Sequence, residues 1–493
     1  MPTANGSHKT DILIVGAGPA GLVLACELAR RGLDFRLIEQ REEPLIAVRG
    51  KGVQPRTLEI FEDLGVLPDV LRVGGPYPPR RIVKGAGNVS EFPFTTKNQP
   101  TEDIPYPNLL MVPQWRTEAA LRARLETFGG RVHENEKLLR FTQDETGVVA
   151  TVEGPKGHFD IYAKYMIATD GGRSTVRTDL GVGFPGKVLD GPRFLYGDVE
   201  IDGLDRDAWW MWPSEGARLT LCPLPHTNTF QLVVALLPDE EPSLDLKSIA
   251  ALIHGRTGRH DLRLISTGWL AISQPSIRLA DRYRVGRILL AGDAAHIHPV
   301  FGGQGLNTSI QDAYNLGWKL ALVLQGAHPQ LLDTYEAERR PVGSAMLDLV
   351  DKLAAVPAEN QTRGHQTQQL DLNYRGSPLN RELGTESGIV RAGDRAPDAR
   401  YTKADGSSAR LFEEFQGPHF TLLLFGNAPE PNDQIQWLLR IVRILGGNDG
   451  PSKIYGIENN ALVLVRPDNY IAMLDRTASP HSVAEWFSEF IAI

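Results

Sequence analysis

Apolar residues near the start of the chain follow the pattern of a strand, a helix and a second strand. Residues 12–15 form a short run that is apolar throughout, which is typical of a strand buried on both faces. Residues 20–31 have apolar positions at helical spacing, and Gly32 ends the pattern. Residues 35–38 predict the next strand. The beginning of the chain therefore predicts an α/β unit.

The middle of the chain has a different pattern. Residues 194–199, 217–223 and 229–237 are apolar stretches interrupted by proline and glycine. Strands separated by such turn residues predict a mostly antiparallel sheet. Further on, a strand at residues 288–291 is followed by a helical pattern from about residue 308 to residue 324.

The last part of the chain begins with a polar stretch. Residues 357–380 are rich in Gln, Asn, Arg and Gly and predict a linker. Residues 420–425 and 461–465 predict buried strands, and Ser479-Pro480 predicts the start of a last helix. We expect a small α/β unit there.

Three glycines follow the first strand at a spacing that suits a phosphate-binding turn. Gly16 allows the tight turn, Gly18 the close approach of backbone to a pyrophosphate, and Gly21 the packing of helix on strand. Glu39 ends the second strand, eighteen residues after Gly21. A carboxylate there can accept hydrogen bonds from ribose hydroxyls. The unit predicts a dinucleotide site but does not separate FAD from NAD.

Two later strands also end in acidic turns. Asp170-Gly171 precedes Ser174 and Arg177, although such a turn also occurs before a capped helix that binds nothing. Asp293, after Gly292, can accept hydrogen bonds from ribose or ribitol hydroxyls. Together with the N-terminal turn, it predicts one long cofactor, FAD, held at both ends by a discontinuous domain.

Glycines and histidines follow Asp293. Gly302, Gly303 and Gly305 precede the long helix, whose N-terminus can stabilise negative charge on a reduced flavin. His296 and His298 are spaced i, i+2, and no Cys or carboxylate cluster completes a metal site. We expect no metal and a hydrogen-bonding or structural role for both histidines.

Composition narrows the classes of function. The 493 residues include 52 Lys and Arg against 60 Asp and Glu, and no basic run, so nucleic acid is not an expected partner. No apolar run reaches the ~18 residues of a membrane span, and we expect no membrane partner. Cys26 and Cys222 form no metal or redox motif, which fits a cytoplasmic location.

The three motif segments resemble those of the class A flavoprotein monooxygenases. This aromatic hydroxylase family is typified by p-hydroxybenzoate and phenol hydroxylases and includes polyketide hydroxylases. The resemblance covers roughly residues 9–345 and includes residues 55–59 and Arg116. Lys51 departs from it, because small residues are usual at that position.

The resemblance implies a set of residues near the flavin. Those expected to bind the cofactor are Gly16, Gly18, Gly21, Glu39, Gln40, Arg49, Gln114, Asp170, Gly292, Asp293, Pro299, Gly305, Leu306 and Asn307. Arg49 and Pro299 would also lie beside the reacting groups, and no catalytic base is assignable. FAD is the expected cofactor, with NADPH or NADH and O2 as cosubstrates.

Pattern and resemblance together predict an α/β fold. We expect a discontinuous Rossmann-like FAD-binding domain, an inserted and mostly antiparallel substrate sheet, and a thioredoxin-like C-terminal domain that packs or dimerises. The expected parts are residues 1–185 (first FAD-binding segment, with a substrate-domain insertion near 76–104), 186–280 (substrate sheet), 281–356 (second FAD-binding segment), 357–390 (linker) and 391–493 (C-terminal domain).

A tryptophan-rich stretch, residues 208–213, belongs to the predicted substrate sheet. It is either an aromatic wall for a planar substrate or ordinary sheet core, and core is the more frequent role of such residues. The candidate substrate contacts are Tyr196, Trp209, Trp210, Trp212 and Leu221.

The resemblance implies a monooxygenase that hydroxylates a phenolic or polycyclic aromatic molecule through a flavin C4a-hydroperoxide. Baeyer–Villiger oxygenation and flavin-dependent halogenation on the same fold are alternatives, although the tryptophan-rich stretch lacks the spacing of the halogenase motif. A non-enzymatic binding protein is a third alternative, which the complete set of flavin motifs disfavours.

Overall fold

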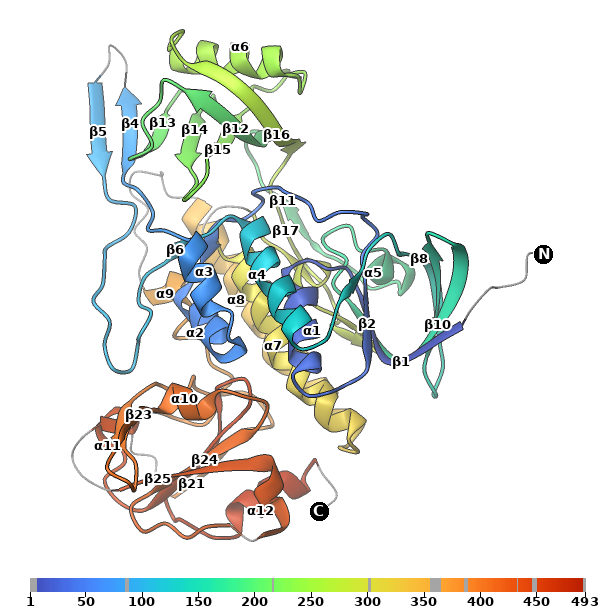
Figure 1. Ribbon diagram of the computed structural model, residues 1–493, viewed down its shortest axis with the longest axis vertical. Helices are drawn as coiled ribbons and strands as arrows, with labels where there is room; N and C mark the ends of the chain where they lie inside the picture. Colours follow the sequence, from blue (N-terminus) through green and yellow to red (C-terminus); the bar gives the residue numbers. More distant parts are fainter. Residues whose placement is uncertain are drawn as a thin grey trace.

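The computed structural model describes residues 7–84, 88–214, 217–299, 303–354, 365–384, 389–431, 433–445 and 450–490. The fold is mixed α/β, and its parts follow one another along the long axis (Figure 1). An upper sheet lies at one end, a central α/β unit in the middle, and a C-terminal unit, in orange and red, at the other end.

The central unit is built on a mostly parallel sheet with strand order β18-β19-β10-β1-β2-β7. The bounds are Ser7–Val15 for β1, Phe35–Ile38 for β2, Val132–His133 for β7, Gly157–Ala168 for β10, Arg284–Val285 for β18 and Ile288–Leu290 for β19. β1 runs parallel to β2 and β10, and β10 runs parallel to β19. An antiparallel hairpin extends from β10; its strands are β8, Lys137–Gln143, and β9, Val148–Gly154. Segments far apart in the sequence thus form one sheet.

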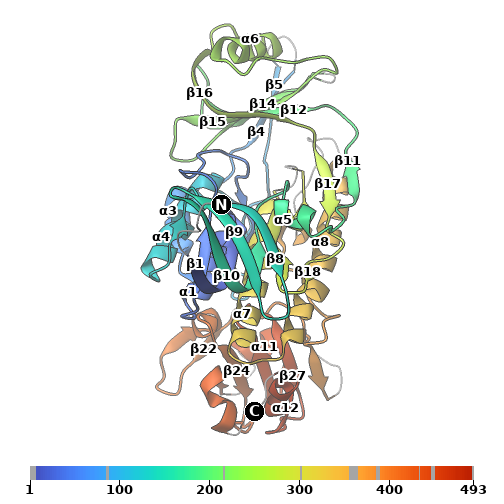
Figure 2. The ribbon, with the colours of Figure 1, turned by 90° about the vertical axis from the view of Figure 1, so that its right-hand side faces the viewer.

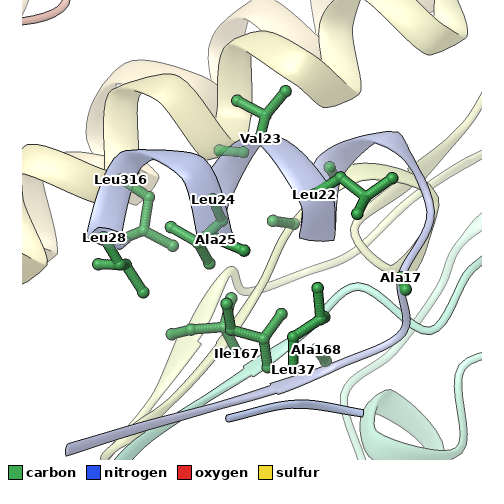
Figure 3. Packing of buried hydrophobic residues seen from close by; sticks show 14 of the residues in the cluster. Ala17, Leu22, Val23, Leu24, Ala25, Leu28, Leu37, Ile167, Ala168 and Leu316 are labelled. Carbon is green, nitrogen blue, oxygen red and sulfur yellow. The ribbon is translucent and has the colours of Figure 1, made fainter. Parts of the chain in front are cut away.

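Two helices from opposite ends of this unit pack closely on each other. They are α1, Pro19–Ala29, and α7, Gly305–Leu324. A Cβ at Gly317 would lie 2.6 Å from the Cβ of Glu27, so glycine permits the approach. Figure 3 shows Leu316 of α7 beside α1, with Ile167 of β10 and Leu37 of β2 below.

The boundaries of α7 differ from the prediction. The helix begins at Gly305, three residues before the predicted start near residue 308. Glycine disfavours helix interiors, but its cost is small in a first turn, so it did not prevent the earlier start. The other helices of this unit are α2 Pro55–Leu64, α3 Leu67–Val73, α4 Gln114–Thr127, α5 Thr175–Asp179 and α8 Asp333–Ala354.

The upper sheet has the strand order β16-β12-β15-β14-β13-β4-β5. The bounds are Arg80–Lys84 for β4, Asn88–Phe92 for β5, Phe194–Asp202 for β12, Trp209–Trp212 for β13, Leu219–Pro223 for β14, Thr229–Ala235 for β15 and Arg263–Ser273 for β16. All neighbours are antiparallel except β13 and β4. One helix, α6 (Leu246–Thr257), covers the outer face and buries Ile249 and Ile253 there (Figure 2).

The C-terminal unit contains a five-stranded sheet of order β21-β27-β26-β24-β25. Its strands are β21 Arg381–Leu383, β24 Phe420–Phe425, β25 Leu439–Ile444, β26 Ala461–Val465 and β27 Ile471–Asp475, with helices α10 Leu411–Phe415, α11 Gly450–Tyr455 and α12 Ser482–Ser488. The strands predicted at 420–425 and 461–465 are confirmed. The last helix begins two residues after Pro480.

Part of the predicted linker is folded, which corrects that prediction. Residues 381–383 form β21, and the Gln369 side chain is fully buried. Gln369 accepts from Gln311 and donates to Gln304, both at 2.6 Å. A polar composition usually indicates solvent exposure, but here buried amides satisfy one another. Residues 355–364 and 385–388 of the predicted linker region lie outside the described part.

Buried charges join the C-terminal unit to the central unit. Glu338 of α8 accepts from Lys319 of α7 at 2.7 Å and from Arg466, after β26, at 2.6 Å. Arg466 also pairs with Asp468, whose carbonyl accepts from Arg56 of α2 at 2.8 Å. These five side chains are at most 2% exposed. Although burial opposes ionisation, Arg466 and Lys319 lower the pKa of Glu338. Paired ions of this kind fix the C-terminal unit against α2, α7 and α8.

Both cysteines are free and buried. Burial raises the pKa of Cys26 to about 12, so its thiol is unreactive and packs as a small apolar group, as expected. Among the helices that the structure describes, none combines the length and apolarity needed to cross a lipid bilayer.

Candidate active site

The turn after β1 needs glycine at each of its three fingerprint positions for a different reason. Gly16 has φ +104°, and a Cβ there would lie 2.5 Å from the carbonyl oxygen of Thr169. A Cβ at Gly21 would lie 2.0 Å from the carbonyl oxygen of Gly16. A Cβ at Gly18 would meet no atom within 4 Å, because Gly18 borders a cavity. The turn is thus tight on the protein side and open on the side where a phosphate would lie.

Glu39 stands at the end of β2, beside this turn. Its carboxylate accepts from the backbone N–H of Ala17 and of Arg41, each at 3.1 Å. The side chain therefore connects the glycine turn with the end of the neighbouring strand. Gln40, the next residue, lines the cavity.

A cavity of about 470 Å³ brings the predicted segments together. It lies beyond the carboxyl ends of β1, β2, β10 and β19, the edge at which open α/β sheets bind ligands. The upper sheet forms its other wall. The predicted site residues that line it are Gly18, Gln40, Arg49, Gln114, Asp170, Tyr196, Trp209, Asp293, Pro299, Gly305 and Leu306.

The Asp170 turn is joined to the Asp293 turn by Arg177. Asp170 accepts from the backbone N–H of Val176 at 3.2 Å, and Ser174 caps α5 by accepting from the N–H of Arg177 at 2.9 Å. The guanidinium of Arg177 donates to the carbonyl of Ala294 at 2.9 Å. Burial raises the pKa of Asp170. The polar groups of this turn thus hold two cavity segments together, and Asp170 also lines the cavity.

Asp293 directs its carboxyl into the cavity. Gly292 before it has φ +63°, a conformation that favours glycine, and donates its N–H to Asp312 at 3.0 Å. The surrounding protein raises the pKa of Asp293. A group that donates hydrogen bonds to this carboxylate, such as a sugar hydroxyl, would stabilise the charged form.

The two histidines form a hydrogen-bonded chain with Asp312. His298 Nε2 lies 3.0 Å from His296 Nδ1, and His296 Nε2 lies 2.7 Å from Asp312 Oδ2. Arg339 donates to the other carboxylate oxygen at 2.7 Å. The predicted hydrogen-bonding role of both histidines is confirmed. Among the described residues, no group of three or more His, Cys, Asp and Glu could hold a metal.

Arg49 and Gln114 meet at the cavity through Glu118, which the sequence did not single out. Gln114 donates to Glu118 at 2.8 Å, and Arg49 lies 3.6 Å from the same carboxylate. The Arg49 side chain is 43% exposed, so it is held loosely and reaches the cavity. Burial raises the pKa of Glu118.

Asn307 has a different role from the one predicted. Its Oδ1 accepts from the N–H of Gln54 at 2.8 Å, and its Nδ2 donates to the carbonyls of Gly52 at 2.8 Å and Gly303 at 2.7 Å. The side chain is fully buried and does not line the cavity. Its side chain therefore fixes the backbone of two cavity segments. Gly302 lies outside the described residues.

The predicted substrate contacts divide between the two faces of the upper sheet. Tyr196, Trp209 and Met211 line the cavity. Trp210, Trp212 and Leu221 lie on the opposite face, in the apolar cluster beneath α6, so their prediction as substrate contacts is corrected. Successive side chains of a strand point to opposite faces, and α6 determines which face is core. For Trp210 and Trp212 the alternative interpretation as sheet core is confirmed.

Several cavity residues were not proposed as contacts from the sequence. They are Tyr77, Arg80, Phe94, Arg218, Thr220, Gln231 and Val233, together with Lys51, which was noted only as a departure. Thr220, Gln231 and Val233 lie on β14 and β15. Because successive side chains of a strand point to opposite faces, their alternate positions were the signal that could have found them. Tyr77, Arg80 and Phe94 come from the segment around β4 and β5, whose place in the sheet depends on long-range pairing.

Comparison with known proteins matches both parts of the chain. The family model described as FAD binding domain matches residues 9–350, and that of the aromatic-ring hydroxylase C-terminal region matches residues 390–489. A flavin-dependent monooxygenase of Mycobacteroides abscessus is 41% identical, over 97% of this chain and 100% of its own length. A 12-dehydrotetracycline 5-monooxygenase/anhydrotetracycline 6-monooxygenase of Streptomyces rimosus is 32% identical over 96% of each chain.

The chain belongs to the class A flavoprotein aromatic hydroxylases. This hydroxylase is an FAD-dependent aromatic monooxygenase, as the resemblance implied. Its fold superimposes on the crystal structure of aklavinone-11 hydroxylase with FAD and aklavinone with a TM-score of 0.81, at 27% identity over 98% of both chains. NAD(P)H and O2 are the usual cosubstrates of the family.

The residues of this hydroxylase fit FAD. The open side of Gly18 can receive a pyrophosphate at the N-terminus of α1, and the Asp293 carboxyl can accept a hydroxyl hydrogen bond at the other end. The backbone at the N-terminus of α7 borders the cavity at Gly305 and Leu306. The chain therefore offers a phosphate turn, acidic groups and a helix N-terminus around one cavity.

Proposed function

We propose that this hydroxylase inserts one oxygen atom from O2 into an electron-rich aromatic ring, of phenolic or polycyclic type, at the expense of NAD(P)H. The observation that carries the proposal is the two-sided cavity. One side presents the residues suited to FAD, and the other is a sheet face with Tyr196, Trp209 and Met211. Both reactants can therefore meet in one cavity.

The relatives support the class of substrate. The names of two of them refer to anhydrotetracycline and aklavinone. A cavity walled by aromatic side chains suits a planar molecule of this kind because rings stack on rings. Tyr77 and Phe94 stack at a centroid distance of 4.5 Å, and Trp209 lies 5.2 Å from Phe94.

Each part of the chain has a role in the proposed reaction. The Gly16–Gly21 turn and Asp293 would hold FAD, which, when bound, supplies the redox chemistry with NAD(P)H and O2. Arg49, loosely held beside Glu118, would position the reactants at the part of the cavity that Gln114 also lines. The upper sheet would orient the substrate ring and exclude water from it.

The finer architecture is part of the same proposal. The parallel sheet with α1 and α7 would be the discontinuous FAD-binding domain, and the upper sheet with β4 and β5 the substrate domain. The unit from β21 to α12 would be a thioredoxin-like domain without thiol chemistry, because both cysteines lie elsewhere in the chain. The molecule could pair through this unit as a homodimer in the cytoplasm.

The proposal is tested with a panel of phenols and polycyclic quinones under 18O2, scored for NAD(P)H oxidation and product mass. One labelled oxygen on an intact ring is the expected product. A lactone would indicate Baeyer–Villiger oxygenation, and a halogenated ring formed in the presence of chloride or bromide would indicate a halogenase. NAD(P)H oxidation that no panel member stimulates, in FAD-loaded protein, would contradict the proposal.

A further inference from the structure

Lys51 places a cation in the wall of the cavity, on the side of the upper sheet. It directly precedes the short strand β3, Gly52–Val53, and is only 9% exposed. Its ammonium donates to Gln231 of β15 and lies 4.0 Å from the ring centroid of Trp209 on β13. Gln231 is itself fixed, because its amide nitrogen donates to the carbonyl of Val48 at 2.9 Å. The cation is thus held at the substrate face of the upper sheet.

Two more cations share this side of the cavity. Arg80, on β4, and Arg218, just before β14, line it together with Lys51. The carboxylates among the described lining residues are Asp170 and Asp293, which both belong to the cofactor side. Asp198, behind the wall, accepts from the N–H of Val48 at 2.9 Å. Burial raises the pKa of Asp198 to about 6, and even when ionised this one carboxylate balances only one of the three positive charges.

The aromatic wall lies next to these cations. The ring of Trp209, under the Lys51 ammonium, contacts Phe94, and Phe94 stacks on Tyr77. A ligand lying on this wall would therefore have flat apolar contacts and a positive potential at one edge. Neutral polycyclic molecules would gain the flat apolar contacts but no attraction from the positive potential.

We propose that the substrate side of the cavity binds a planar aromatic molecule as an anion, either a carboxylate or an ionised phenol or enol, with Lys51 facing the charged group. This inference rests on the proposed function for the location of the substrate and adds the charge state in which it binds. Arg80 and Arg218 contribute to the field, and Tyr77, Phe94 and Trp209 hold the ring.

The test compares two probes of the same shape by titration calorimetry with FAD-loaded protein. They are 2-naphthoate, an anion, and 2-naphthamide, its neutral counterpart. We expect the anion to bind about tenfold more tightly, the ratio that one charge-assisted hydrogen bond supplies. Equal affinities, or no detectable binding of either probe, would overturn the proposal without requiring any variant.

Variants then assign the preference to Lys51. Lys51→Met should reduce the ratio of the two dissociation constants to about one, whereas Lys51→Arg should keep most of it because the charge remains. Arg81→Met is the matched control, since Arg81 follows Arg80 but pairs with Glu91 and Asp207 at the surface. Its ratio should equal that of the unchanged protein. A preference that survives Lys51→Met would overturn the role of Lys51.

Phenolates provide the second arm. A nitrophenol bound to the unchanged protein should ionise at lower pH than in solution, as its absorbance shows, and Lys51→Met should abolish this shift. An unshifted pKa in the unchanged protein would exclude the phenolate form and leave the carboxylate form, which the naphthoate ratio tests. Failure of 18O incorporation with every substrate would contradict the proposed function alone, because none of these measurements depends on turnover.

Discussion

Asp293 is the single residue whose loss should be most visible in cofactor binding. Its carboxyl faces the cavity just beyond the strand β19 and accepts a long hydrogen bond from the Ser309 hydroxyl at 3.5 Å. Asp293→Ala removes an acceptor for a hydroxyl, worth roughly 1.5–3 kcal/mol when charged. We expect FAD affinity to fall at least about tenfold, measured by titrating apoprotein.

Asp293→Asn removes the negative charge of the side chain but keeps its shape. The amide keeps one oxygen as an acceptor, so FAD affinity should fall less than in Asp293→Ala. An unchanged affinity in both variants would show that this residue does not hold the cofactor.

Arg49 should affect turnover more than folding. Its side chain is 43% exposed and lies 3.6 Å from the Glu118 carboxylate, so little stability depends on this ion pair. Arg49→Ala should slow substrate-stimulated flavin reduction by about tenfold, while the thermal midpoint stays nearly unchanged. Stopped-flow absorbance and thermal unfolding are the measurements.

Arg177 provides the contrast to Arg49. Its guanidinium is buried and donates to the carbonyls of Ala294 and Gly172. Arg177→Ala leaves these acceptors without their donors and should lower the stability clearly, by about 1–3 kcal/mol. Equal losses of stability in the two alanine variants would mean that Arg49 is structural.

Residues fixed by local spacing were predictable from the sequence, and residues fixed by distant partners were not. Gly16, Gly18 and Gly21 follow a strand directly, so chain geometry alone decides their roles. Asn307 was expected to reach the cofactor, but its partners come from residues 52–54, on a strand far away in the sequence. No local pattern contains that information.

At the scale of elements, the existence of a strand could be predicted from local sequence, but the face that it turns to the cavity could not. The strand at residues 209–212 and its alternation could be predicted, but which alternate positions face the cavity could not. That choice depends on α6, which follows more than thirty residues later and buries one face with Ile249 and Ile253. From the sequence alone, Trp209 and Trp210 are equally good candidates for the cavity face. The structure places Trp209 at the cavity and Trp210 in the cluster beneath α6.

The junction between η1 (Gly292–Ala294) and α7 should respond to acid. Asp312 of α7 accepts from Gly292 N–H, from His296 and from Arg339. Although burial opposes its charge, His296 and Arg339 lower the pKa of Asp312. A lowered folded-state pKa gives a stabilisation that is complete above the unfolded value, about 4, and is lost as the pH falls through the folded value.

Asp312→Asn should therefore lower the stability at pH 7 and weaken its dependence on pH below about 4. Urea unfolding at a series of pH values checks this. Asp333→Asn is a suitable control, because Asp333 pairs with Arg284 at the surface and is 65% exposed. Parallel acid curves for Asp312→Asn and the unchanged protein would contradict the assignment.

At the scale of the whole molecule, the C-terminal unit should be required for stability. Arg466→Met removes the Arg466 guanidinium from Glu338 and leaves the Lys319 pair, inside a junction whose side chains are at most 2% exposed. Breaking a buried ion pair on one side costs about 3–5 kcal/mol. We expect a lower thermal midpoint and earlier loss of FAD on heating, followed by flavin fluorescence.

Arg443→Met is the matched control for that variant. Arg443 pairs with Glu430 on the surface of the same unit, where both side chains are more than a third exposed. Such a pair contributes about 0–1 kcal/mol, so the midpoint should hardly move.

A chain that ends near residue 384 should aggregate, because removal of the C-terminal unit uncovers Trp318 and Leu322.

The connection between the units was the least predictable feature. Low apolar content at residues 357–380 predicted a linker, because polar chains usually cannot bury themselves. Gln369 is buried nevertheless, since Gln304 and Gln311 supply the matching amide groups. The match between Gln369 and two glutamines of α7 and its N-cap, more than fifty residues earlier, leaves no trace in composition.

The long helix α7 limits where insertions and deletions can occur in this chain. Gly305 and Leu306 at its start border the cavity, whereas Lys319 and Trp318 near its end belong to the junction with the C-terminal unit. One inserted or deleted residue would turn everything after it by about 100°. Lys319 would then swing away from Glu338 while the cavity end stayed in place. We therefore expect relatives to gain or lose residues between helices and strands, and to keep the number of residues from Gly305 to Lys319 unchanged.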